Sequence, residues 1–185
     1  MDGTLTVKVL RSRSELAAVA DECVDLALHG AEPSPLDQPR HKGTRCVLVW
    51  IDRRGGRKLG ALFPFGGPGF YRGLPLLSLS SGTPLVRAGW ERPCLHALLE
   101  WFRQDGEGAA LLEFRALSRG GPIYRAFAEV ARQREQLVLA ATAADGSRTL
   151  LVSDRTWGER TSATLPLARW TKRAVARVVY GQLDF

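Results

Sequence analysis

The pattern of hydrophobic and polar positions divides the chain into short strands and amphipathic helices. Residues 4–10 alternate and are rich in β-branched side chains, which predicts a strand. Apolar residues then recur at the spacing of one helical face, from Ser14 as a candidate N-cap to Gly30 as a C-terminal stop. Three prolines and several charges in residues 31–44 predict a loop.

The next part of the pattern predicts three strands. Residues 45–52 and 58–65 are apolar runs on either side of Gly55-Gly56, and this pair of glycines favours a hairpin because it supplies the positive φ of a tight turn. Residues 66–73 are rich in glycine and predict a loop carrying two aromatic side chains. Residues 74–80 predict a further short strand.

In residues 92–153 the pattern of apolar positions predicts helices alternating with strands. The predicted helices are 92–104 and 123–134, and the predicted strands are 110–117, 137–143 and 148–153. The whole order is strand, helix, three strands, helix, strand, helix, two strands. It predicts an α/β fold with a mixed, mostly antiparallel central sheet flanked by helices.

Length and composition fit one folded domain at residues 1–153, followed by a basic segment at 154–185. The chain has 185 residues, of which 45% are apolar. Its three cysteines are far apart and its three histidines have no metal-ligand spacing, so we expect buried thiols and neither a metal site nor a Ser-His-Asp site. No apolar run is long enough to span a bilayer, and we expect a cytoplasmic protein.

The net charge of +7 is concentrated toward the end of the sequence. From Arg155 onward there are 6 basic and 2 acidic residues, and residues 165–185 predict a basic amphipathic helix. Such a helix can dock a partner domain or a second copy of the chain, or it can pack on its own domain. Nucleic-acid binding is a third hypothesis, which no aromatic-basic motif of a known nucleic-acid fold supports.

Several phrases resemble those of a known family. The strand at 58–65 ends in a Gly-x-x-x-Pro-like phrase at Leu59–Phe65, a Leu-rich strand follows within 73–82, and an amphipathic helix ends in Trp101-Phe102. Together with the element order, residues 3–153 resemble the GNAT acyltransferase superfamily, and within it the cellulose-biosynthesis-type acetyltransferase domain. In that family two GNAT-like halves commonly share a longer chain, and we expect this sequence to cover the first half and a linking helix.

The resemblance implies an acyl-CoA site between two splayed strands. Backbone N–H groups at a helix start would hold the pyrophosphate there. The family phrase is Arg/Gln-x-x-Gly-x-Gly/Ala, whereas this chain reads Arg87-Ala88-Gly89-Trp90-Glu91-Arg92. The glycine offset differs and Glu91 would repel a pyrophosphate, although Arg87 and Arg92 would partly compensate. The preceding turn, Ser81-Gly82-Thr83, could bind an anion or an acyl carbonyl, or serve only as a turn.

The resemblance also implies a catalytic tyrosine. The family phrase Asn-x-x-Ala-x-x-Tyr corresponds to Ser118-x-x-Gly121-x-x-Tyr124, so Tyr124 could protonate the departing thiolate. The alternative is a structural tyrosine whose ring packs against the core while its hydroxyl group contacts water.

Glu100 and Glu113 are candidate general bases, and we expect Glu113 to be exposed to solvent on its strand.

Two functions follow from the resemblance. The first is an N-acyltransferase that uses acyl-CoA, chiefly acetyl-CoA, as co-substrate and a small-molecule amine such as an amino sugar as acceptor. The second is a non-catalytic GNAT-like binding module, one half of a tandem or hetero-oligomeric acyltransferase. The altered pyrophosphate loop favours the second hypothesis, and the retained Tyr124 favours the first.

Overall fold

A computed structural model describes residues 3–32, 45–67, 69–71, 73–79, 84–118, 120–134, 137–142 and 148–153. The side chains of residues 107, 116, 137–142 and 148 are not part of that description. Three predictions lie outside the described residues: the turn Ser81-Gly82-Thr83, the helix at 165–185 and the domain boundary at 153/154.

The first sheet contains the strands β1 (Thr4–Leu10), β2 (Arg45–Arg53), β3 (Gly56–Phe65) and β6 (Leu85–Val86). Its order is β1-β2-β3-β6, and every pair is antiparallel. The predicted hairpin between β2 and β3 is confirmed, with Gly56 at a φ of 124°, which a residue with a side chain rarely adopts.

The second sheet contains β4 (Gly69–Tyr71), β5 (Leu74–Ser78), β7 (Leu111–Leu117), β8 (Leu137–Thr142) and β9 (Arg148–Ser153). Its order is β4-β5-β7-β9-β8, and only the β5–β7 pair is parallel. The predicted α/β class with a mixed, mostly antiparallel arrangement is confirmed. The strands form two sheets, which meet at a bridge between Phe65 and Leu79 and at a hydrogen bond from the Gly66 N–H to the Ser78 carbonyl at 2.8 Å.

The helices are α1 (Arg13–Ala17), α2 (Ala20–Leu28), α3 (Glu91–Gln104) and α4 (Pro122–Gln133), with a short 3-10 helix, η1, at Gly106–Gly108. The single helix predicted from Ser14 is wrong in two ways. It starts after Ser12, whose hydroxyl caps Glu15 while the Glu15 carboxylate accepts the Ser12 N–H. It also breaks near Val19, so α1 and α2 are separate.

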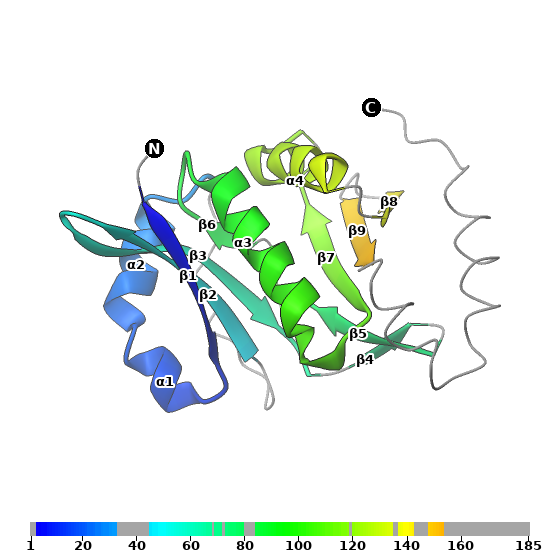
Figure 1. Cartoon of the computed structure of the whole chain (residues 1–185), viewed down its shortest axis with the longest axis horizontal. Helices are drawn as coiled ribbons and strands as arrows, with labels where there is room; N and C mark the ends of the chain where they lie inside the picture. Colours follow the sequence, from blue (N-terminus) through cyan, green and yellow to red (C-terminus); the bar gives the residue numbers. More distant parts are fainter. Residues whose placement is uncertain are drawn as a thin grey trace.

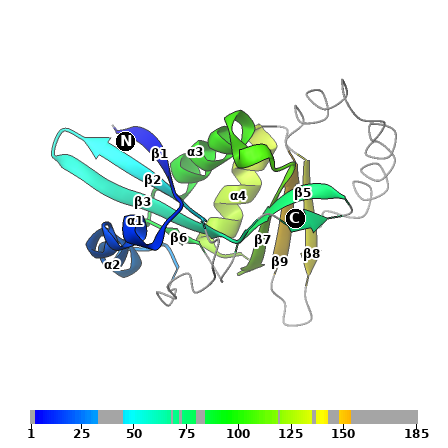
Figure 2. The same cartoon turned by 90° about the horizontal axis from the view of Figure 1, so that it is seen from below.

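The helices cover the first sheet on both faces. Figures 1 and 2 show α1 and α2 on one face and α3 on the other, with α4 beside α3 toward β7. Alternate residues of β2 enter two cores: Val47, Val49 and Ile51 belong to the main core, which contains α3 and α4 side chains, while Leu48 and Trp50 belong to the core beneath α2. Burial on both faces explains why β2 is a continuous apolar run.

The second sheet is covered by described helices on one face. Leu77, Leu112 and Phe114 join the main core with residues of α3 and α4. The opposite face carries a smaller cluster of Leu76, Ala110 and Leu111. Among the described residues, α1 and α2 lie beneath the first sheet and not beneath this second cluster (Figure 2).

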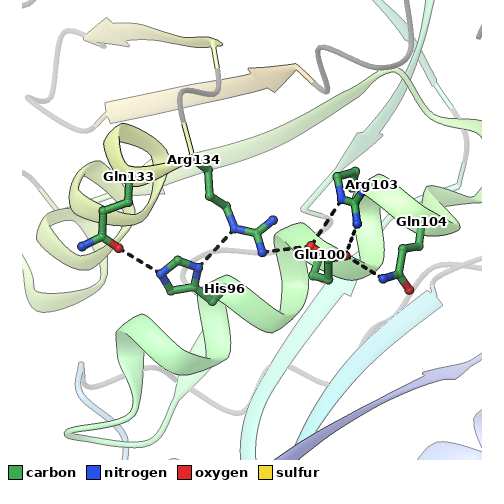
Figure 3. Close-up of polar contacts among 6 residues, drawn as sticks. All are labelled: His96, Glu100, Arg103, Gln104, Gln133 and Arg134. Carbon is green, nitrogen blue, oxygen red and sulfur yellow. Dashed lines mark hydrogen bonds and ion pairs between the residues drawn. The ribbon is translucent and has the colours of Figure 1, made fainter. Parts of the chain in front are cut away.

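A polar network ties α3 to the end of α4 (Figure 3). Arg134 donates from Nε to His96 Nδ1 at 3.1 Å and from Nη2 to Glu100 at 3.0 Å. His96 Nδ1 is therefore the acceptor, and Nε2 donates to the side-chain Oε1 of Gln133 at 3.1 Å. Arg103, followed by Arg134 and Gln104, donates to Glu100 and lowers the pKa of its carboxyl group to about 2.

Gly60 lies in β3 against buried side chains, and its replacement tests the packing of the core. A Cβ atom there would lie 2.8 Å from Ile51 Cγ1 and 3.0 Å from Cys94 Sγ. We expect Gly60→Ala to lower the free energy of unfolding by about 1–3 kcal/mol, the usual range for an overpacked core. Gly55→Ala is the control, because its Cβ would meet nothing within 4 Å. Equal urea midpoints for the two variants would contradict the packing described.

Glu100 gives a pH-dependent prediction. Because its folded-state pKa is depressed from 4.5 to about 2, its stabilising contribution is present above pH 4.5 and is lost as the pH falls toward 2. We expect Glu100→Gln to cost about 1 kcal/mol at pH 7, since the carboxylate is partly screened by water, and almost nothing at pH 2. Chemical denaturation at both pH values, with Glu22→Gln as control, measures the difference. A cost that does not change with pH would refute the assignment.

Candidate functional site

The two parallel strands β5 and β7 separate just beyond Ser78 and Glu113. Their last aligned pair joins these two residues, and the Leu79 N–H donates to the Glu113 carbonyl at 3.0 Å. Leu79 already bridges to Phe65 on the other side, and β6 then pairs with β3. The chain thus crosses from one sheet to the other at this point. The loop that starts α3 follows β6 directly.

Three polar side chains meet where the strands part. Ser78 Oγ donates to Glu113 Oε2 at 2.5 Å, and Arg115 approaches the same oxygen from Nε and from Nη2, each at 2.8 Å. Glu113 is only 9% exposed, so the predicted solvent exposure of this residue is wrong. Its strand lies between β5 and β9, and the donors from Ser78 and Arg115 offset the cost of burying its charge.

The loop before α3 is already occupied by a carboxylate of the chain itself. The Gly89 N–H donates to Glu91 Oε1 at 3.0 Å, and the N-cap residue, Trp90, makes no side-chain cap. Pro93, in the first turn, has no N–H to offer. A negative group therefore sits at the positive end of the helix dipole, in the place where the resemblance implies a pyrophosphate.

The two arginines predicted to bind the pyrophosphate both make ion pairs within the domain. Arg87 Nη2 pairs with Asp25 of α2, and its Nε donates to the Leu59 carbonyl at 3.0 Å. The hydrogen bond from Arg87 lowers the pKa of Asp25. The Arg87 side chain is 13% exposed, whereas Arg92 is 62% exposed and pairs with Glu129 of α4. Arg87 therefore joins α2 to the first sheet.

A short segment after α2 pairs with the second edge of β6. The Ala31 N–H donates to the Val86 carbonyl at 2.7 Å, and the Ala88 N–H donates to the His29 carbonyl at 3.0 Å. Gly30 forms an antiparallel bridge with Arg87 between these two bonds. Since β3 pairs with the first edge of β6, residues 29–31 lie along the other edge of β6 and of the two residues that follow it. The sequence pattern predicted only a helix end and a loop here.

Glu32 extends this segment to the start of α4. Its Oε1 accepts from the Ile123 N–H at 3.4 Å and lies so near Gly121 that a Cβ there would be 2.2 Å away. The N-terminal ends of α3 and α4 therefore each hold a carboxylate of the chain: Glu91 and Glu32. We call residues 29–32, with their bonds to β6 and α4, the closing segment.

Tyr124, the predicted catalytic acid, lies in the first turn of α4, one residue after Ile123. It is partly buried and packs against the main core. Its hydroxyl group has no hydrogen-bond partner among the residues that the structure describes. This position brings Tyr124 to the same helix end as Glu32, while its role as an acid stays a prediction.

The three cysteines lack the exposed, low-pKa thiol that a reactive cysteine needs. Cys23, Cys46 and Cys94 are buried free thiols, as expected, and burial raises their pKa values to about 11, 11 and 12. Within the described ranges, no group of three or more potential metal ligands comes together. None of the described helices has the length and apolarity of a membrane span.

Comparisons with known proteins add little to this geometry. No protein-family model and no curated protein matches the sequence. Among solved structures, a chain from "The crystal structure of KacTA-DNA complex" has a TM-score of 0.42 and 14% sequence identity, and the match covers 86% of this chain and 99% of that chain. Likeness at this level carries no argument about function. The inference of function therefore depends on the strand order and on the residues at the strand separation.

The contrast between Arg87 and Arg92 gives a stability test. We expect Arg87→Ala to lower the free energy of unfolding by about 2 kcal/mol, because it removes a partly buried ion pair and a hydrogen bond that tie α2 to the sheet. Arg92→Ala removes an exposed pair and should cost less than about 0.5 kcal/mol. Urea unfolding measures both. Equal losses for the two variants would show that Arg87 does not anchor α2.

Proposed function

We propose that this domain is the non-donor half of a GNAT-type amine acyltransferase. In this role it is a binding module, and a second domain or chain supplies the acyl-CoA site. One observation carries the proposal: the closing segment, residues 29–32, pairs with the edge of β6 and extends Glu32 to the start of α4. Residues 29–31 occupy the edge of β6 that β3 leaves free, and β6 ends directly before the loop and helix where the resemblance implies the acyl donor.

The electrostatics of the two helix ends support the same function. A pyrophosphate needs unpaired N–H groups and a positive environment. Here the Gly89 N–H already bonds to Glu91, and Glu32 lies at the neighbouring helix. Two like charges 5 Å apart repel by roughly 3 kcal/mol at an effective dielectric constant near 20. Each carboxylate would therefore oppose a bound pyrophosphate by an amount that matters for affinity.

The second candidate function is a complete N-acyltransferase with acetyl-CoA as donor, and the position of Tyr124 favours it. Displacement of Glu32 would free the first turn of α4 directly beside this tyrosine. A neutral amine would attack the thioester carbonyl and lose a proton to a base. The carbon–sulfur bond would break, and the leaving thiolate would take the phenolic proton of Tyr124.

Acetyl-CoA binding separates the two functions. Calorimetric titration and thermal unfolding would be measured for the native chain and for the double variant Glu32→Gln/Glu91→Gln, with Glu22→Gln as a charge-matched control. Under the proposal, acetyl-CoA at about 1 mM raises the melting temperature of none of them, because no ligand binds the folded state.

A gain of binding confined to the double variant would favour the second candidate, with the closing segment as a movable cover of a working donor site. Binding by the native chain together with acetylation of an amine would overturn the proposed function outright.

A further inference from the structure

Strand β1, dark blue in Figure 1, is the outer strand of the first sheet. The sheet order is β1-β2-β3-β6, so β2 pairs with one edge of β1, and no described strand pairs with the other edge. The strand is seven residues long, contains no proline and pairs with β2 without a bulge. It therefore lacks the two backbone features, a proline and a bulge, that commonly block the free edge of a sheet.

The side chains of β1 are less buried than those of its neighbour on the same face. Three apolar side chains of β1 pack against the main core and are only half-buried: Leu5, Val7 and Val9. The residues of β2 that align with them are at most 3% exposed. Helix α3 packs against both strands. The difference in burial is that expected when one strand has a neighbour on each side and the other has a neighbour on one side only.

The sequence of β1 is complementary to itself in the antiparallel direction. If two copies of the chain pair about a two-fold axis at Val7, all seven residues of β1 align, with Val7 opposite Val7 and Leu5 opposite Val9. These apolar pairs extend the face that α3 covers, and pairs of β-branched side chains stabilise adjacent strands. A shift by one residue would instead place each apolar side chain beside a polar one.

The charges at this edge favour the same register. In it Lys8 of one copy lies opposite Thr6 of the other, and the Thr6 hydroxyl donates to Asp52 Oδ2 at 2.8 Å. The Lys8 ammonium group would thus lie beside the Asp52 carboxylate of the second copy, whose side chain is 41% exposed and whose Oδ1 pairs with Arg57 at 3.2 Å. The two-fold axis makes this contact twice. An axis at Lys8 would instead bring two ammonium groups face to face.

We propose that β1 is a homodimer interface, in which the β1 strands of two copies pair antiparallel about Val7. The pairing joins the two four-stranded first sheets into one continuous sheet. The occupant of the edge is a second copy of this chain, because the same seven residues supply both partners of every apolar pair and the cation for Asp52. The inference goes beyond the proposed function, since it uses neither Glu32 nor Glu91 and does not depend on an acyl donor.

Sedimentation of the full chain over a range of concentrations tests the dimer. Pairing of one seven-residue strand buries less area than a standard interface, so we expect a dissociation constant of roughly 10–100 µM. A chain that stays monomeric up to about 1 mM would overturn the proposal, since even an interface of the weakest specific class would be populated there.

A charge reversal at the edge locates the interface. Lys8→Glu places a carboxylate beside Asp52 of the second copy and should weaken the dimer about tenfold or more. Lys58→Glu is the control, because it makes the same charge change at an exposed lysine of β3, away from the edge. The control should keep the native dissociation constant within about twofold. Equal dissociation constants for the two variants would overturn the proposal.

A cysteine at the two-fold axis tests the register. Opposite residues of antiparallel strands have Cα atoms about 4.5–5.5 Å apart, a distance that a disulfide can bridge. We expect Val7→Cys, oxidised with glutathione disulfide, to form a covalent dimer. Leu5→Cys should not, because its two copies would lie about 13 Å apart along the strands. The native cysteines give no background, since all three are buried. Equal cross-linking of the two variants, or none in Val7→Cys, would overturn the proposal.

Discussion

The structure depends on the hydrogen bonding of β6, a strand of only two residues at the junction of the two sheets. Every backbone N–H and C=O group buried there needs a partner. On one edge the partners come from β3, and on the other they come from His29 and Ala31 of the closing segment. This second set of bonds uses the edge that an extended ligand would need. Under the proposed function, the bonds that stabilise the junction therefore compete with binding of an acyl donor.

The charges around the junction follow from the same constraint. Once the closing segment lies along β6, Glu32 reaches the start of α4, and Arg87 can pair with Asp25 on α2. Glu91 independently fills the start of α3. The observed strand order is thus combined with anionic groups of the chain at both helix ends. Arg87, which the resemblance assigns to a pyrophosphate, ties α2 to the first sheet instead.

Much of the fold could be predicted because it depends on local periodicity. Helices α3 and α4 and strands β2, β3, β7 and β9 follow clear apolar patterns, and their order gave the α/β class. The glycine-rich stretch predicted as a loop contains β4, which forms only because β5 lies beside it. Strand β6 and the closing segment escaped prediction for the same reason. They are two and four residues long, and their partners are distant in sequence.

The candidate site was predictable in part. The pattern pointed to Arg87, Arg92 and Tyr124, and the structure brings the loop before α3 and the start of α4 to the same junction. It also shows Arg87 and Arg92 engaged with Asp25 and Glu129. The burial of Glu113 could not be predicted from β7 alone, because its partner Ser78 lies 35 positions away. Ion-pair and strand partners at such separations leave no signal in a single sequence.

Amide hydrogen exchange at Ala31 and Ala88 is the most direct measurement of the central claim, the closure of the donor groove by residues 29–32. If the closing segment is part of the folded domain, these two amides exchange as slowly as those of neighbouring β3, and acetyl-CoA does not change their rates. Rapid exchange in the free protein, or protection that appears only when acetyl-CoA is added, would contradict the account.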